Sequence, residues 1–92
     1  MSGHEEGLIS QYVNEIQALG VRAEAGEDVV KETDAAVARA VEHFRIVKSS
    51  DPQANLSAFK GRLAITADVA HSSQPAFKRT LRHAADSCPA EI

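Results

Sequence analysis

The 92-residue sequence has a single cysteine, and it lacks any uninterrupted apolar run of the length that a membrane span needs. Because Cys88 is alone, it can form no disulfide bond within the chain and no zinc site with several thiolate ligands. A chain without disulfide bonds is typical of reducing compartments. Residues 1–6 also lack the basic region and apolar stretch of a signal peptide. These absences predict a cytoplasmic protein with no membrane span.

Side chains that bind metals or carry out catalysis are also sparse. The four histidines, His4, His43, His71 and His83, are never three or four residues apart, so no two of them form a pair of ligands on one helix face. The five glycines are scattered singly and form no phosphate-binding loop. We therefore expect a protein that is not an enzyme and that uses no metal and no cofactor.

The apolar content is moderate and rich in alanine. Of 40 apolar residues, 16 are alanine and one is Cys88, which leaves 23 large side chains to build a core. A chain of this length forms one domain, residues 1–92, and buries roughly two-thirds of the surface that its unfolded form exposes. So thin a core predicts association with a partner or with a second copy.

The net charge of −3 is unevenly distributed. Residues 1–34 carry eight acids and two bases (net −6), whereas residues 35–92 carry five acids and eight bases (net +3). Such asymmetry can mark an interaction surface, through attraction between opposite ends of two copies, and its more ordinary interpretation is a set of solvated helix faces.

The first half of the chain has the pattern of two amphipathic helices. From Glu5 to Leu19 the large apolar residues share one arc of a helix, and Gly20 is expected to end it, with 21–26 as a turn. Over 27–48 they form a 3-4-3-4-3 stripe: Val30, Thr33, Val37, Ala40, Phe44 and Val47. We expect these two helices to form an antiparallel hairpin.

The second half also has helical patterns. A helix start at residues 50–52 introduces a segment with two apolar stripes, which predicts either one helix apolar on both sides or two short helices broken at Gly61. Another start signal precedes a last helix from Pro75 to about Asp86. No segment alternates with the period of a strand. The expected fold is all-α, a small bundle of four or five helices without a sheet.

One short motif resembles the phosphorylation site of histidine phosphotransfer domains. It is Ser57-Ala58-Phe59-Lys60-Gly61, in which Ser57 stands where that family has its phosphate-accepting histidine. Because the accepting residue is different, the resemblance implies no phosphotransfer activity for this chain.

A second motif, Ser73-Gln74-Pro75-Ala76 followed by Arg79 and Arg82, resembles the helix-turn-helix of LysR-type transcription regulators. In that family the segment opens the recognition helix, which lies in the major groove of DNA. The resemblance implies a DNA-binding repressor with a helix-turn-helix over residues 63–86. Its DNA-facing residues would be Ser73, Gln74, Lys78, Arg79 and Arg82.

Our leading hypothesis is a small cytosolic regulator that acts by binding another protein. It would be a homodimeric antiactivator or anti-factor that masks a transcription regulator with an apolar helix face. The expected dimer or partner interface consists of Leu8, Tyr12, Ile16, Val37, Val41 and Phe44, and the same residues could instead form an ordinary core. The alternatives are the DNA-binding repressor and a structural subunit of a larger assembly.

Overall fold

Each amphipathic segment of the sequence forms one helix in the computed structural model, which describes residues 4–48 and 56–89. The helices are α1 (His4–Glu24), α2 (Val30–Lys48), α3 (Leu56–Val69) and α4 (Pro75–Ser87). Four helices and no strand make up this part of the chain, so the predicted all-α bundle is confirmed for it. The helix start predicted at 50–52 lies outside the described residues.

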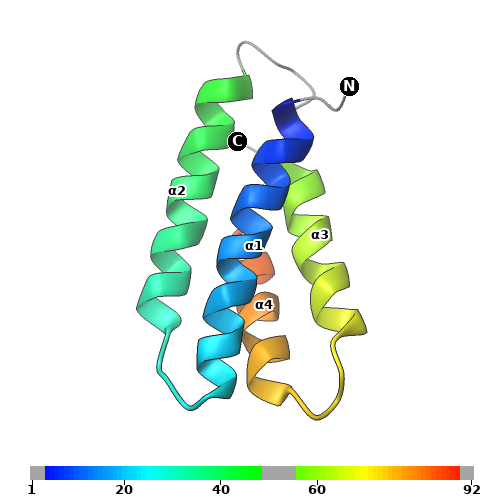
Figure 1. Ribbon diagram of the computed structural model, residues 1–92. Helices are drawn as coiled ribbons and strands as arrows, with labels where there is room; N and C mark the ends of the chain where they lie inside the picture. The colour runs from blue at the N-terminus through cyan, green and yellow to red at the C-terminus, as the bar shows by residue number, and fades with distance from the viewer. Residues whose placement is uncertain (1–3, 49–55, 90–92) are drawn as a thin grey trace.

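The bundle has a central pair of helices, α1 and α4, with α2 and α3 on opposite sides of that pair (Figure 1). The connections 25–29 and 70–74 lie at the same end of the molecule, the bottom of Figure 1. The largest fully buried side chains come from all four helices: Ile16, Thr33, Phe44, Phe59, Leu63 and Leu81. The core therefore lies between the helices, where one apolar stripe of each is removed from water.

The first helix is longer than its sequence predicts. Gly20 lies inside α1, which ends at Glu24 and is closed by Gly26, whose φ of +104° is easily adopted only by glycine. The Gly26 amide donates to the Ala23 carbonyl (3.0 Å) and the Glu27 amide to the Arg22 carbonyl (3.1 Å). This pair of bonds is a Schellman motif, which satisfies carbonyl groups at the end of the helix.

Gly20 allows α1 and α4 to approach each other closely. A Cβ atom at this position would lie 2.8 Å from Cδ2 of Phe77 and 3.1 Å from Cδ1 of Leu81. The glycine that predicted a helix end at residue 20 therefore marks a close contact of α1 with α4, inside the helix.

The third helix is continuous through Gly61, so the predicted alternative of two short helices is wrong. Its inner stripe is buried and consists of Leu56, Phe59, Leu63 and Ala67. The opposite stripe, Ala58, Ile65 and Val69, is exposed, and we call it the outer stripe of α3.

Replacing Gly61 with alanine should stabilise the protein by about 1 kcal/mol, because alanine has the higher helix propensity. A Cβ atom added here would meet no heavy atom within 4 Å, so no clash opposes the gain. Urea denaturation followed by circular dichroism measures the effect. An unchanged or lower free energy of unfolding in the variant would contradict a continuous helix with open space beside this position.

An aromatic cluster occupies the core between α1, α2 and α3. The ring centroids of Phe44 and Phe59 lie 5.5 Å apart, and the Tyr12 ring lies 6.3 Å from that of Phe59 in an edge-on orientation. The Tyr12 hydroxyl lies 3.0 Å from Nδ1 of His43, so its polar end has a hydrogen-bond partner. These three rings connect the two halves of the sequence.

Candidate binding surface and cavity

The six residues expected at a dimer or partner interface face the interior of the chain. Five of them are no more than 9% exposed: Leu8, Tyr12, Ile16, Val37 and Phe44. Val41 is partly buried and packs against the same core. The Phe44 ring, for example, packs against Phe59 of α3. All six thus belong to the buried core of the chain or pack against it.

The residues expected to face DNA lie at the start and on the outer side of α4. Ser73, Gln74, Arg79 and Arg82 are exposed, and Lys78 is partly buried. Arg82 forms an ion pair with Asp68 of α3, and Ser73 is bonded to the His71 ring through both its amide (3.1 Å) and its hydroxyl (2.8 Å). The structure thus gives two of these five side chains partners within the chain.

The outer stripe of α3 is the most exposed apolar feature of that helix. Ile65 is 61% exposed and Val69 is 76% exposed, and the two are one helical turn apart. Arg62, between Ala58 and Ile65 on the same side, is also exposed, and within the described ranges its guanidinium forms no ion pair. The stripe therefore combines two large apolar side chains with one free positive charge.

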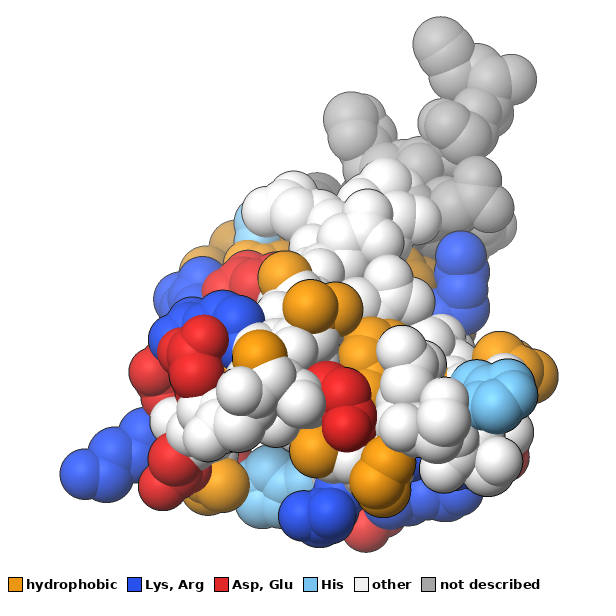
Figure 2. Space-filling view, turned by 60° about the horizontal axis from the view of Figure 1, so that its bottom comes forward, with side chains coloured by type: hydrophobic (Ala, Val, Ile, Leu, Met, Phe, Trp, Pro, Cys, Tyr) orange, Lys and Arg blue, Asp and Glu red, His pale blue; other side chains and the backbone are white. Residues whose placement is uncertain are grey.

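A cavity of about 330 Å³ lies at the end of the bundle where α1 passes into α2. Residues from α1, the 25–29 connection, α2 and α4 line it: Ala23, Glu27, Asp28, Val29, Val30, Thr33, Ala76, Arg79, Thr80 and His83. Figure 2 shows this end of the molecule, where hydrophobic side chains lie among acidic and basic ones and neither sign of charge dominates. The cavity is thus mixed in character, with apolar walls and several polar groups.

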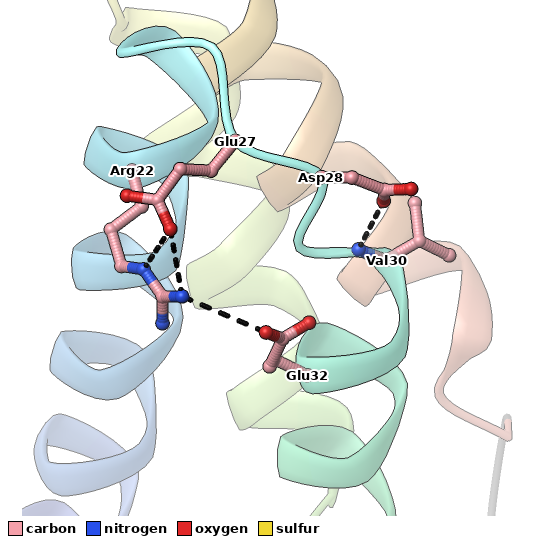
Figure 3. Close-up of polar contacts among 5 residues, drawn as sticks. All are labelled: Arg22, Glu27, Asp28, Val30 and Glu32. Atoms are coloured by element: carbon pink, nitrogen blue, oxygen red, sulfur yellow. Dashed lines mark hydrogen bonds and ion pairs between the residues drawn. The ribbon is translucent and has the colours of Figure 1, made fainter.

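Both acidic side chains of the cavity already have partners, as Figure 3 shows. Glu27 Oε1 accepts hydrogen bonds from Arg22 Nε (3.0 Å) and Nη2 (2.9 Å), and Glu32 lies 3.6 Å from the same guanidinium. The hydrogen bond to Glu27 raises the pKa of Arg22 above its ordinary value, as does the charge of that carboxylate. Asp28 Oδ1 accepts from the Val30 amide (3.2 Å), which satisfies a backbone donor at the start of α2.

Two polar groups of the cavity stand out because they lack such partners. Thr33 is 1% exposed, and its Oγ1 has no hydrogen-bond partner within the described part of the chain. The Arg79 guanidinium is exposed and, among the residues that the structure describes, forms no ion pair. His83, by contrast, has its Nε2 2.7 Å from Oδ1 of Asp34. Sequence reasoning gave Thr33 only a place in the packing stripe, because nothing in the stripe distinguishes its hydroxyl from a methyl group.

The N-terminus of α4 is capped by a residue from α1, which the sequence could not reveal. Glu24 Oε1 accepts hydrogen bonds from the Ala76 amide (3.0 Å) and the Phe77 amide (3.2 Å). Gln74 occupies the N-cap position without a side-chain bond to the helix. The carboxylate also complements the positive end of the helix dipole, so α1 and α4 are joined by charge as well as by packing.

Cys88, the only cysteine, is buried. Its side chain is directed to the Ala84 carbonyl (Sγ to O 3.4 Å), and Lys60 Nζ donates to its carbonyl oxygen at 3.1 Å. Burial raises the pKa of the thiol to about 11, although the Lys60 charge acts in the opposite direction. At neutral pH the group is therefore a protonated core residue rather than a nucleophile.

We expect alkylation of Cys88 by iodoacetamide at pH 8 to be at least about a hundredfold slower in the folded protein than in urea. The reason is that a pKa of about 11, against 9.0 for a free thiol, lowers the thiolate fraction by that factor. Since the folded pKa is the higher one, the contribution of the thiol to stability is complete below pH 9 and is lost as the pH rises towards about 11. A Cys88→Ala variant should lack this alkaline loss, and labelling at equal rates in both states would contradict the account.

Two further classes of site are not found in the described residues. No group of three or more histidine, cysteine, aspartate or glutamate side chains there could hold a metal ion. No helix of the same residues has the length and apolar character to cross a membrane.

Comparisons with protein-family models, with curated proteins and with solved structures find no match to this chain.

Proposed function

We propose that the protein is a small cytosolic regulator that acts by binding another protein through the outer stripe of α3. The observation that carries this proposal is the exposure of Ile65 and Val69 on a helix whose other side is already in the core. Complete burial of two such side chains is worth about 1.5–3 kcal/mol each. That gain supports a docking role for the stripe.

The chemistry of the stripe indicates what the partner must present. An apolar groove would receive Ile65 and Val69, and a carboxylate at its edge would pair with Arg62, whose charge is free in the described part of the chain. The occupant would be a different protein that presents this groove and carboxylate.

The mechanism would be steric, as for an antiactivator or anti-factor that masks a transcription regulator. Helix α3 would fill the groove that the regulator uses for another contact, and Arg62 would fix the orientation. Masking of this kind needs no chemical step. The apolar side chains and the positive charge of the stripe would serve for binding alone. That the target is a transcription regulator is part of the same proposal.

The proposal includes an antiparallel hairpin of α1 and α2, which would support α3 from its inner side. Three cross-helix pairs favour it, because the residue number rises in α2 as it falls in α1. Arg22 lies near Glu32, Glu15 is paired with Arg39, and Tyr12 is bonded to His43. Both helices would hold the inner side of α3 in place through the aromatic cluster.

In the test, three forms of the full chain are immobilised, and the proteins that each form captures from the native cytosol are compared. The Ile65→Gln/Val69→Gln variant changes only exposed side chains, so its fold should be retained, and Val21→Gln, at a 62% exposed valine of α1, is the matched control. We expect the wild type and the control to bind the same transcription regulator. With that regulator purified, calorimetry should give a Kd about tenfold or more higher for the double variant.

Two results would overturn the proposal. One is equal binding of the regulator by the double variant and the wild type, which would place the contact elsewhere. The other is recovery of no transcription regulator by any form. Circular dichroism on the same samples verifies that the variants are folded.

A further inference from the structure

Helix α2 lies at one side of the bundle, and it differs from the other helices in how it is held there (Figure 1). We propose that α2 is a strap that opens as a unit while α1, α3 and α4 stay packed together. The open form exposes the part of the core that Phe44 covers, including the rings of Tyr12 and Phe59. The inference concerns the inner side of the bundle, so it does not rest on the function proposed for the outer stripe of α3.

The inner stripe of α2 consists mostly of small side chains. Its buried residues are Thr33, Ala36, Val37, Ala40 and Phe44, and only two of these five are large and apolar. The inner side of α1 has large apolar residues at six buried positions: Leu8, Ile9, Tyr12, Val13, Ile16 and Leu19. Because stabilisation by burial scales with the apolar area removed from water, α2 gains less from the core than α1 does.

The packing of α2 against α4 is incomplete near the 25–29 connection. The cavity of about 330 Å³ lies there, lined by Val30 and Thr33 of α2 and by Ala76 and Thr80 of α4. Side chains that border such a space lack the dense packing of a protein interior. Helix α3, by contrast, packs closely against α4. The start of α2 is therefore the place where the bundle is least tightly closed.

Thr33 adds a local cost to the closed form. Its Oγ1 atom has almost no access to solvent and, among the described residues, no hydrogen-bond partner. A buried hydroxyl without a partner destabilises the conformation in which it is buried, and such exceptions in native proteins call for an explanation such as stored strain. When α2 opens, water reaches the hydroxyl and the cost disappears.

The polar links between α2 and its neighbours are mostly at the surface. In the described part of the chain they include three ion pairs whose side chains are all at least 33% exposed: Arg22–Glu32, Glu15–Arg39 and Asp34–His83. Exposed ion pairs contribute little to stability, because water solvates the separated charges well. The half-buried bond between Tyr12 and His43 can also be replaced by bonds to water. Helix α2 is thus the element that opens at the lowest free energy.

Native-state hydrogen exchange of the full chain, followed by NMR at a series of urea concentrations, tests this inference. We expect the most protected amides of α2, within residues 36–44, to have protection factors at least about tenfold lower than the most protected amides of α1 and α4. Their protection should also fall less steeply with urea, because the opening of one helix exposes less surface than global unfolding does.

Two matched variants test the part that Thr33 plays. Thr33→Val keeps nearly the same shape without the hydroxyl, so it should raise the protection of the α2 amides at least about fivefold. Thr80→Val is the control, because Thr80 also lines the cavity but its Oγ1 already donates to the Ala76 carbonyl (2.9 Å). Its replacement should not raise the protection of α2.

The inference is wrong if the most protected amides of α1, α2 and α4 share one protection factor and one urea dependence, since all three helices then open only by global unfolding. It is equally wrong if the α2 amides of Thr33→Val are protected no better than those of the wild type. Circular dichroism on the same samples verifies that both variants are folded.

Discussion

Replacing Phe59 with alanine should lower the free energy of unfolding by about 3–5 kcal/mol. The side chain is 0% exposed, and its ring contacts two other aromatic rings, with centroid distances of 5.5 Å to Phe44 and 6.3 Å to Tyr12. Removal of the ring costs its transfer from water and leaves a cavity between three helices. Aromatic pairs add about 0.5–1.5 kcal/mol each beyond the area that they bury.

The expected loss is large for a chain of this size. At about 0.05–0.15 kcal/mol per residue, a 92-residue domain has a total stability of roughly 5–14 kcal/mol. The variant should therefore unfold at a much lower urea concentration than the wild type, as monitored by circular dichroism. Phe59→Leu, which keeps most of the apolar volume, should lose less. A loss below about 1 kcal/mol in Phe59→Ala would contradict the placement of this ring at the centre of the core.

Leu81→Ala should destabilise the protein by about 2–5 kcal/mol, and it should change the effect of a second substitution, Gly20→Ala. Leu81 is 0% exposed, and its Cδ1 would lie 3.1 Å from a Cβ atom at Gly20. Alone, Gly20→Ala gains about 1 kcal/mol of helix propensity but adds an overpacking cost of about 1–3 kcal/mol, because Phe77 would lie only 2.8 Å away. We expect a net loss in the single variant.

In the double variant the new methyl group and the Phe77 ring can use the space that Leu81 leaves. The effect of Gly20→Ala should then be about 1 kcal/mol more favourable than in the wild type, a coupling that a double-mutant cycle measures by urea denaturation. Gly61→Ala, whose Cβ would meet nothing within 4 Å, is the control and should be additive with Leu81→Ala. Additive effects of Gly20→Ala as well would contradict the close contact of α1 with α4.

The sequence predicted the helices well because their apolar stripes recur at the helical period. Leu8, Tyr12 and Ile16 lie on one buried face, as do Val37 and Phe44 of the next helix. The partners of those faces could not be predicted, because a periodic stripe looks the same whether it packs against α3 and α4 or against a second molecule. This is why the expected interface lies in the core.

Other features depend on contacts between residues far apart in the chain. Gly20 has the same local signature as a helix end, yet its role comes from Phe77, 57 residues later. Glu24 caps α4 from a distance of 52 residues in sequence, and the cavity draws residues from three helices. The two stripes of α3 were visible in the sequence, but only the structure showed which of them is exposed.

Site-specific photo-crosslinking in the native cell tests the central claim most directly, because it reports what touches a chosen side chain. A benzophenone side chain would replace Ile65 in one variant and Val21, the exposed valine of α1, in a second. If the outer stripe of α3 is the docking surface, position 65 should form a covalent adduct with a transcription regulator and position 21 should not. Adducts with that regulator from position 21 but not from position 65, or no adduct at position 65, would contradict the account.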